Sequence, residues 1–232
     1  MNNRPPAYLK DDYYTVDDVK LYQSHFNLDI VRYFFPNRRK LIYLDIGSFD
    51  AGDSIRFKMK FPCSVVYSIE ADPNRFEFIK SLEKHGINAR NYAVCNKTEV
   101  VDFYQSYDPN ANEIKSGPAG SMLKATNWAK ETYNHLTYLE EPIKVQGIRL
   151  DDFCKKENIK TIDVIHMDVE GVGKEIIQGF GDIKPKLINM EIEAVLQNYE
   201  GSSTVEEIES LLFPLGYEFI ETNHGDSLYK LK

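Results

Sequence analysis

The sequence predicts an α/β protein built on a doubly wound sheet that is mostly parallel and has an antiparallel terminal strand. Two apolar runs carry the prediction: Leu41–Leu44, which leads into Asp45 and Gly47, and Val65–Ile69, which leads into Glu70. Each run has the length and the β-branched and aromatic content of a strand, and a helical pattern separates the two. Strands that alternate with helices form parallel sheets covered by helices on both faces.

Residues 1–40 are expected to form an irregular arm over 1–14 and a peripheral helix over 15–36. Thr15 has the hydroxyl group of a helix N-cap, and two acidic residues follow it in the first turn. Apolar residues then recur at helical spacing as far as Pro36: Val19, Tyr22, Phe26, Ile30 and Phe34. We expect this helix to pack on the sheet, with a lid over the site as the alternative.

Residues 41–232 are predicted to form one domain that holds the sheet. Its strands are expected near residues 41–46, 64–70, 88–94, 99–104, 143–150, 162–167 and 187–190. Its helices are expected at 52–60 and 73–84, from 151, between the last two strands as far as 179, and from the cap at 203–204. A hairpin over 217–231 closes the chain and supplies the antiparallel edge.

Residues 105–141 lack clear periodicity and are predicted to be an insertion or lid with one helix near 126–137. Long loops in compact domains are often binding loops or lids. Its aromatic residues are candidates for an acceptor wall, with ordinary core packing as the alternative: Trp128, Tyr133 and Tyr138.

Composition narrows the class of protein. The chain has 232 residues, of which 42% are hydrophobic, and this share is typical of a globular protein. Its formal net charge of −8 opposes a nucleic-acid partner. No apolar run approaches the ~20 residues of a membrane span, and Met1–Pro6 does not lead into a signal-peptide core. Three scattered cysteines favour a reducing, cytoplasmic setting. Homo-oligomerisation is left open.

The two strand ends predict a nucleoside site. Glu70 follows Gly47 by 23 positions, close to the ~20 residues that separate the glycine loop from the ribose-binding acid in such sites. The glycine lets the ligand approach the backbone, and the acid accepts the ribose hydroxyls. The alternative is an ordinary strand–loop–helix turn.

The loop after the first strand indicates which nucleoside cofactor is bound. Phe49 stands where a dinucleotide site needs its second glycine, and Asp50 and Asp53 would repel a phosphate. An acidic loop suits a cationic ligand without phosphate, which S-adenosylmethionine is. An NAD-dependent or nucleotide-sugar enzyme is therefore the weaker interpretation, and a binding protein that has lost its chemistry is a third.

Five motifs together resemble the FkbM-type family of S-adenosylmethionine-dependent methyltransferases, over roughly residues 41–200. They are Leu44–Gly47, Glu70–Pro73, Asn91–Val94, Leu150–Phe153 and Ile162–Gly171. The resemblance implies a Rossmann-like sheet of the class I methyltransferase type and O-methylation of a small-molecule or carbohydrate acceptor, often a sugar or a glycosylated product. The chain departs from the family pattern in three places: Ala51 replaces a glycine, His166 a lysine and Gly173 an acid.

Candidate cofactor contacts follow from the loop and from the family motifs. Asp45 would face the amino group of the cofactor, Gly47 would let its methionine part lie against the loop, and Glu70 would bind the ribose. The full predicted cofactor set is Asp45, Gly47, Ser48, Phe49, Glu70, Ala71 and Ala93, the last bordering adenine. Ser121 resembles a small-residue motif before the lid and would touch the acceptor, with a turn serine as the alternative.

The predicted catalytic residues are Asp168, His166 and Glu191. They lie at the ends of neighbouring strands, where open α/β sheets bind ligands. Either His166 is the general base, or Asp168 is the base and His166 orients it. The alternatives are a core histidine at 166, a helix cap at 168, and Glu193 as the site acid with Glu191 structural.

A metal site is also predicted, from the acids Asp168, Glu170 and Glu191. Three carboxylates at one place repel one another unless a proton or a cation joins them. A bound Mg²⁺ that holds two sugar hydroxyls would satisfy this requirement.

Overall fold

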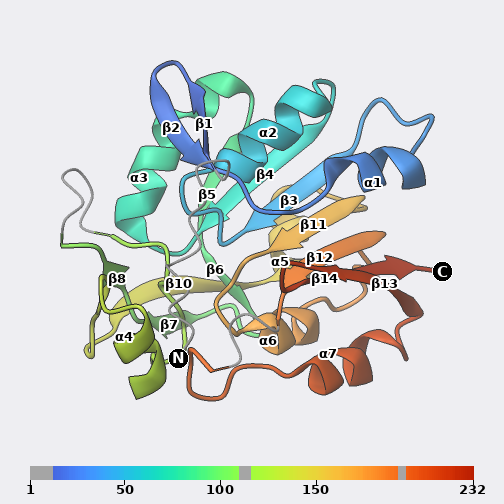
Figure 1. The fold of residues 1–232 in the computed structure, drawn as a ribbon. Coiled ribbons are helices and arrows are strands. Elements are labelled where there is room, and N and C mark those ends of the chain that lie inside the picture. Colours follow the sequence, from blue (N-terminus) through green and yellow to red (C-terminus); the bar gives the residue numbers. More distant parts are fainter. Residues whose placement is uncertain (1–12, 110–115, 193–196) are drawn as a thin grey trace.

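A computed structural model describes residues 13–109, 116–192 and 197–232, and its centre is a twisted seven-stranded sheet (Figure 1). The strand order is β13-β14-β12-β11-β3-β4-β5. The parallel strands are β3 (Ile42–Ile46), β4 (Val65–Glu70), β5 (Asn88–Asn91), β11 (Val164–Met167) and β12 (Leu187–Glu191). The antiparallel edge is the hairpin of β13 (Tyr217–Asn223) and β14 (Asp226–Leu231). The predicted fold class is confirmed.

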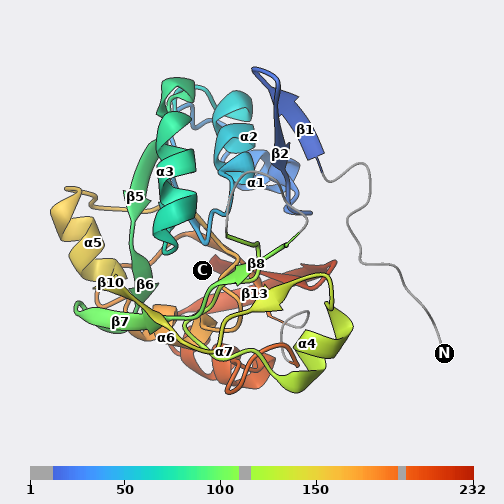
Figure 2. The same ribbon diagram turned by 90° about the vertical axis from the view of Figure 1, so that its left-hand side faces the viewer.

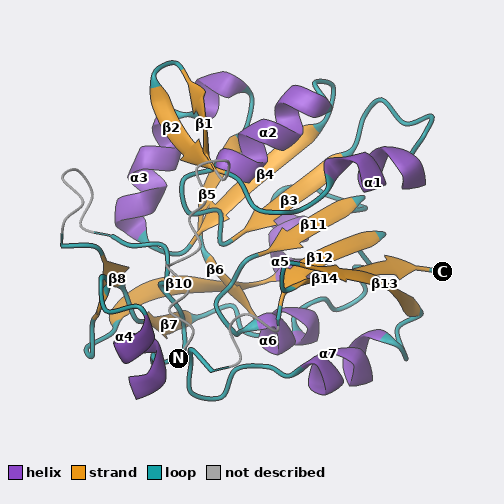
Figure 3. Cartoon of the chain, in the orientation of Figure 1, coloured by secondary structure: helices purple, strands orange, loops and turns teal. Residues whose placement is uncertain are grey.

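Helices cover both faces of this sheet (Figure 3). One face packs against α1 (Leu28–Phe34), α2 (Gly52–Lys60) and α3 (Pro73–Ser81), which is followed by the short 3₁₀ helix η1 (Glu83–His85). The other packs against α5 (Leu150–Lys156), α6 (Gly173–Gln178) and α7 (Val205–Leu212). Helix α7 begins with a capping box in which Thr204 and Glu207 satisfy each other's backbone N–H groups. No helix of the described ranges has the length and apolarity that crossing a membrane requires.

A small second sheet lies beside the main one. It has the order β6-β10-β7, with β6 (Ala93–Cys95), β7 (Val100–Phe103) and β10 (Ile143–Arg149). The strands predicted over 143–150 and 99–104 are both present, and they pair with each other in antiparallel orientation. The single strand predicted over 88–94 is wrong, because the chain leaves the main sheet at Tyr92 and continues as β6 beside β10.

The segment predicted to be an insertion or lid holds α4 (Asn127–Thr132) between the paired short strands β8 (Ser106–Tyr107) and β9 (Thr137–Tyr138). Thr126 caps the helix by accepting a hydrogen bond from the backbone N–H of Ala129. The helix predicted there is confirmed, but it ends at Thr132 instead of continuing to 137.

The predicted N-terminal helix over 15–36 is wrong in its first half. Strands β1 (Tyr13–Val16) and β2 (Val19–Tyr22) form a hairpin, and only α1 is helical; residues 1–12 of the predicted arm lie outside the described residues. Asp17 and Asp18 join the strands with φ of 48° and 66°. Aspartate tolerates this left-handed backbone, so two in succession favour a tight hairpin turn as well as the first turn of a helix.

Candidate functional site

A pocket lies at the carboxyl ends of β3, β4 and β11 and encloses about 590 Å³ including its mouth. Gly117, Pro118 and Ser121, from the segment between β8 and α4, also line it. Five predicted cofactor residues line it: Gly47, Phe49, Glu70, Ala71 and Ala93. Two of the predicted acids, Asp168 and Glu170, line it as well. The other predicted site residues do not: Asp45, Ser48, His166 and Glu191.

The loop between β3 and α2 forms one wall. Its Gly47 has a φ of 78°, and a Cβ there would lie 1.8 Å from the backbone oxygen of Asp168, so that only glycine fits. Phe49 and Ala51 also have left-handed backbone, with φ of 50° and 63°. The loop is thus tightly shaped, and it presses against the β11 end of the pocket.

Glu70, at the end of β4, lines the pocket. Its two carboxylate oxygens accept hydrogen bonds from the backbone N–H groups of Phe49 (2.9 Å) and Asp72 (2.8 Å). Burial raises the pKa of Glu70 to about 7, although both hydrogen bonds act in the opposite direction. Each oxygen keeps a lone pair that can accept a hydroxyl group of a ligand.

Arg75 is a pocket residue that the sequence analysis missed. Its guanidinium lies 4.2 Å from the centre of the Phe49 ring, and it donates a hydrogen bond to the backbone oxygen of Ser116, the residue before Gly117 of the pocket lining. Burial lowers the pKa of Arg75, while Asp50, Glu70 and Asp72 raise it. Its place in the first turn of a helix that starts at a strand end was the available signal, because such turns face the ligand crevice.

The remaining lining is mainly apolar. Tyr92, Val94 and Phe103 surround Ala93, in the segment that the family resemblance assigns to adenine. Ser121 lines the pocket too, but its hydroxyl donates to the backbone oxygen of Glu170 (2.7 Å) and accepts from the N–H of Leu123. The hydroxyl thus makes the contacts of a turn serine, which was the alternative interpretation.

Asp45 and His166 form a buried pair outside the pocket lining. The carboxylate of Asp45 accepts from the hydroxyl of Ser54 (2.7 Å) and lies 2.9 Å from Nδ1 of His166, whose ring stacks in parallel on Phe26. Burial alone would lower the pKa of His166, but the hydrogen bond to Asp45 and the charges of nearby carboxylates outweigh it and raise the pKa to about 9. His166 does not line the pocket and its Nδ1 faces Asp45, so the arrangement favours the alternative in which His166 orients Asp168 over His166 as the general base.

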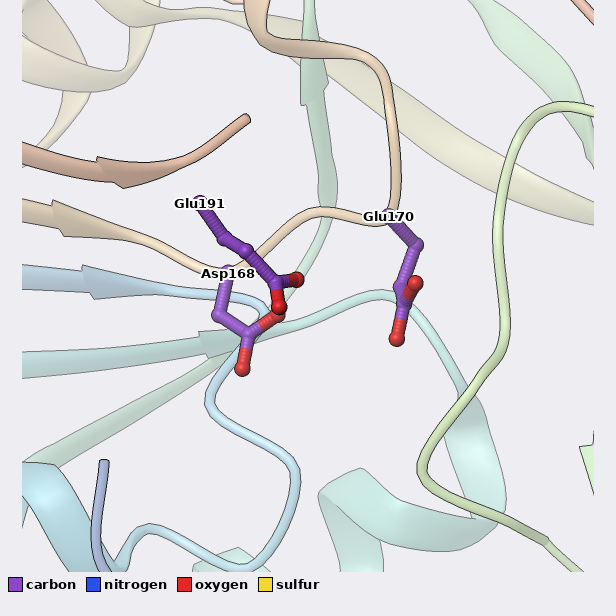
Figure 4. A group of neighbouring side chains, drawn as sticks. All are labelled: Asp168, Glu170 and Glu191. Carbon is purple, nitrogen blue, oxygen red and sulfur yellow. The ribbon is translucent and has the colours of Figure 1, made fainter. Parts of the chain in front are cut away.

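Asp168, Glu170 and Glu191 come together at the other end of the site (Figure 4). One carboxylate oxygen from each lies within 4.8 Å of the others, and the carboxyl groups of Asp168 and Glu191 point toward each other. Burial is the largest cause that raises the pKa of Asp168 to about 6 and that of Glu170 to about 8. Burial and the charges of the other two acids hold the pKa of Glu191 well above its ordinary range. Glu193, the alternative site acid, lies outside the described residues.

Asp50 and Asp53 do not line the pocket, contrary to the sequence-based argument that they repel a phosphate there. Their carboxylates instead accept hydrogen bonds from the backbone N–H groups of Tyr22 (2.7 Å) and Ser24 (2.9 Å). The feature of this loop that opposes a pyrophosphate is therefore the Phe49 ring, which lies in the lining where backbone alone would be needed.

Comparison with known proteins gives the family. The FkbM methyltransferase domain matches residues 45–219. The 2-O-methyltransferase NoeI of Sinorhizobium fredii is 29% identical over 197 residues, which cover 82% of this chain and 79% of that protein.

Solved structures of similar fold include a putative caffeoyl-CoA O-methyltransferase from Staphylococcus aureus (TM-score 0.48, 12% identity, 96% of this chain and 87% of that chain). Another is the precorrin-6y C5,15-methyltransferase of Geobacter metallireducens (TM-score 0.47, 13% identity, 95% of this chain and 92% of that chain). The domain match, which spans most of the sequence, shows that the chain belongs to the FkbM methyltransferase family and is a methyltransferase.

Proposed function

We propose that the protein transfers a methyl group from S-adenosylmethionine to a hydroxyl group of a sugar or glycoconjugate precursor. The observation that carries the proposal is a single pocket that joins Glu70 to Asp168 and Glu170. A nucleoside whose ribose binds Glu70 would extend its reactive end toward the acids. The relative named a 2-O-methyltransferase supports oxygen as the acceptor atom.

The residues present fit S-adenosylmethionine. The Glu70 oxygens can accept the ribose hydroxyls, and the apolar end around Ala93 suits adenine. The Phe49 ring disfavours a dinucleotide, because it occupies the wall on which a pyrophosphate would need bare backbone. The family assignment sets aside the interpretation of a binding protein without chemistry.

We assign the general base to Asp168. When bound, the cofactor supplies a methyl group on a sulfonium, and the acceptor oxygen must approach that carbon in line while its own proton leaves. Asp168 would take this proton. His166 is the positioning residue: its positive charge lowers the pKa of Asp168 and so favours the ionised carboxylate near neutral pH.

Label transfer tests the proposed function. The protein is incubated with S-adenosylmethionine carrying a ¹³C-methyl group and a panel of methyl glycosides and glycosylated small molecules, and the products are identified by mass and NMR. We expect a ¹³C-methoxy group on one sugar and an equal amount of S-adenosylhomocysteine. Label on nitrogen or carbon would overturn O-methylation, and failure to bind S-adenosylhomocysteine would overturn the cofactor assignment.

Glu70→Gln is expected to weaken S-adenosylhomocysteine binding by about 10- to 100-fold. The NH₂ group of the glutamine amide cannot accept a hydrogen bond from a backbone N–H, so one of the two bonds of Glu70 is lost. Isothermal calorimetry at neutral pH measures the effect. Glu77→Gln, an exposed change on the neighbouring helix α3, is the matched control and should bind like the wild type. Equal affinity of all three proteins would remove Glu70 from the ribose site.

We further propose that Asp168, Glu170 and Glu191 hold a divalent cation such as Mg²⁺. Carboxylate oxygens are the ligands that Mg²⁺ prefers, and the cation would offset the repulsion among the three acids. A proton shared by Asp168 and Glu191 is the alternative, since their carboxyl groups face each other.

The pH dependence of stability, measured with and without Mg²⁺, distinguishes a bound cation from a shared proton at the three acids. The pKa values of Asp168 and Glu170 are about 6 and about 8 in the folded state, and carboxyl groups of the unfolded chain have a pKa of ~4. Between pH ~4 and these folded-state values, the folded state therefore binds more protons than the unfolded state. Unfolding free energy is therefore expected to fall as pH rises from about 5.5 to about 8. If the acids bind Mg²⁺, adding it should raise the melting temperature at the higher pH and much less at the lower, and Glu170→Gln should reduce this gain. No gain at either pH would favour the shared proton.

A further inference from the structure

The N-terminal hairpin of β1 and β2 precedes the matched family domain in the sequence (Figure 2). It packs against the start of α2, beside the loop between β3 and α2 that lines the pocket. The hydroxyl of Tyr14 donates a hydrogen bond of 2.5 Å to the backbone oxygen of Gly52. A Cβ on Gly52 would lie 1.6 Å from the backbone oxygen of Tyr22, so the two backbones are in direct contact. The hairpin therefore touches the loop through main chain as well as side chains.

Two buried carboxylates, Asp50 in the loop and Asp53 in the first turn of α2, accept backbone N–H groups of the hairpin and of the segment that follows it. Asp50 accepts from the backbone N–H of Tyr22 (2.7 Å) with one oxygen and from that of Gly52 (2.9 Å) with the other. Asp53 accepts from the N–H of Ser24 (2.9 Å) and pairs with Arg56 (2.6 Å). Burial raises the pKa of Asp50 to about 7, while its hydrogen bonds from Tyr22 and Gly52 act in the opposite direction, so these bonds are strongest when the carboxyl is ionised.

The same loop shapes the pocket. Asp50 directly follows Phe49, whose ring lines the pocket and whose N–H donates to Glu70. Phe49 and Ala51 have left-handed backbone, which costs energy for residues other than glycine and persists only where the surroundings enforce it. The hydrogen bond from the N–H of Gly52 to Asp50 spans Ala51, and the bond from the N–H of Tyr22 fixes Asp50 to the hairpin, so the two contacts together hold this backbone in place.

We infer that the N-terminal hairpin is part of the cofactor site, with Asp50 as the positioning residue that clamps the loop so that Phe49 and Glu70 keep their geometry. The inference rests on the proposed binding of the cofactor ribose at Glu70. It extends the functional unit beyond the family domain, to residues 13–24.

Asp50→Ala in the full chain tests this inference, with calorimetric titration by S-adenosylhomocysteine. We expect the dissociation constant to rise by about 10- to 100-fold, because two buried N–H donors lose their acceptor, while binding keeps one site per chain. Asp50→Asn should show a smaller rise, since its amide oxygen still accepts one of the two bonds. Asp29→Asn, an exposed change on α1, is the matched control.

A purely structural role would give a different result: fewer binding sites per chain, from partial unfolding, with an unchanged dissociation constant. Tyr14→Phe deletes only the hydroxyl contact to Gly52 and provides a milder variant if Asp50→Ala fails to fold. It should raise the dissociation constant by a few-fold, and wild-type affinity in that variant would then overturn the inference.

Hydrogen exchange on the ligand-free protein separates this inference from the proposed function. Loosening the clamp should speed exchange of the amide hydrogens of residues 49–52, and unchanged exchange in Asp50→Ala would overturn the inference whatever the ligand. If the wild type does not bind S-adenosylhomocysteine, the proposed function fails, and with it the assignment of the hairpin to a cofactor site.

Discussion

Asp168→Asn is expected to lower the turnover number by about 100- to 10,000-fold, the usual contribution of a positioned general base. The asparagine side chain has nearly the same shape and cannot accept a proton. S-adenosylhomocysteine affinity should change by less than about twofold, as for a substitution that removes no binding contact. The assay uses the acceptor found by label transfer at saturating cofactor.

The pH profile adds a readout that a structural role would not produce. The pKa of Asp168, about 6, lies above its ordinary range mainly because of burial. Without added divalent cation, the wild-type turnover number should therefore rise with pH through about 6 and then level off, and this step should disappear in Asp168→Asn. Asp182→Asn, at an exposed position beyond α6, is the matched control and should keep the wild-type profile. Parallel losses of turnover and cofactor binding would instead make Asp168 a structural residue.

The strand ends of the site could be predicted from the sequence because each apolar strand stops abruptly at a residue of distinct chemistry. Gly47, Glu70 and Asp168 follow this pattern, and the pairing of β3 with β4 and β11 brings them to one edge of the sheet. Strand alternation also explains where Asp45 lies. Ile46 lines the pocket, so the preceding side chain points to the opposite face, where Asp45 meets His166 across the β3–β11 pair.

The N-terminal hairpin and the contacts of Asp50 could not be predicted, because the local sequence pattern at each place is compatible with two structures. Asp17 and Asp18 suit a helix start as well as a hairpin turn, and contacts to a distant segment, such as the hydrogen bond of Tyr14 to Gly52, favour the hairpin. Likewise, the sequence does not show where the carboxylate of Asp50 points, because that direction depends on the left-handed backbone of its neighbours Phe49 and Ala51. In both cases the deciding partners are far apart in the sequence.

Gly47→Ala is expected to lower the unfolding free energy by about 3 to 5 kcal/mol, through left-handed backbone strain and overpacking together. The new Cβ would lie 1.8 Å from the backbone oxygen of Asp168, an atom held in place by β11. Gly201→Ala is the matched control: its φ of 80° nearly equals the 78° of Gly47, but nothing lies within 4 Å of its Cβ position.

Gly201→Ala should therefore lower the unfolding free energy only by the cost of left-handed backbone strain, about 1 to 2 kcal/mol. Urea unfolding of the ligand-free proteins measures both values, and the difference between the two variants isolates the contact of the loop with the β11 end. Because that contact joins the Glu70 side of the pocket to the Asp168 side, the folded fraction of Gly47→Ala should also bind S-adenosylhomocysteine more weakly than Gly201→Ala. Equal losses in both variants would mean that the two walls can separate without cost, and the tight fit at Gly47 would then have no part in shaping the pocket.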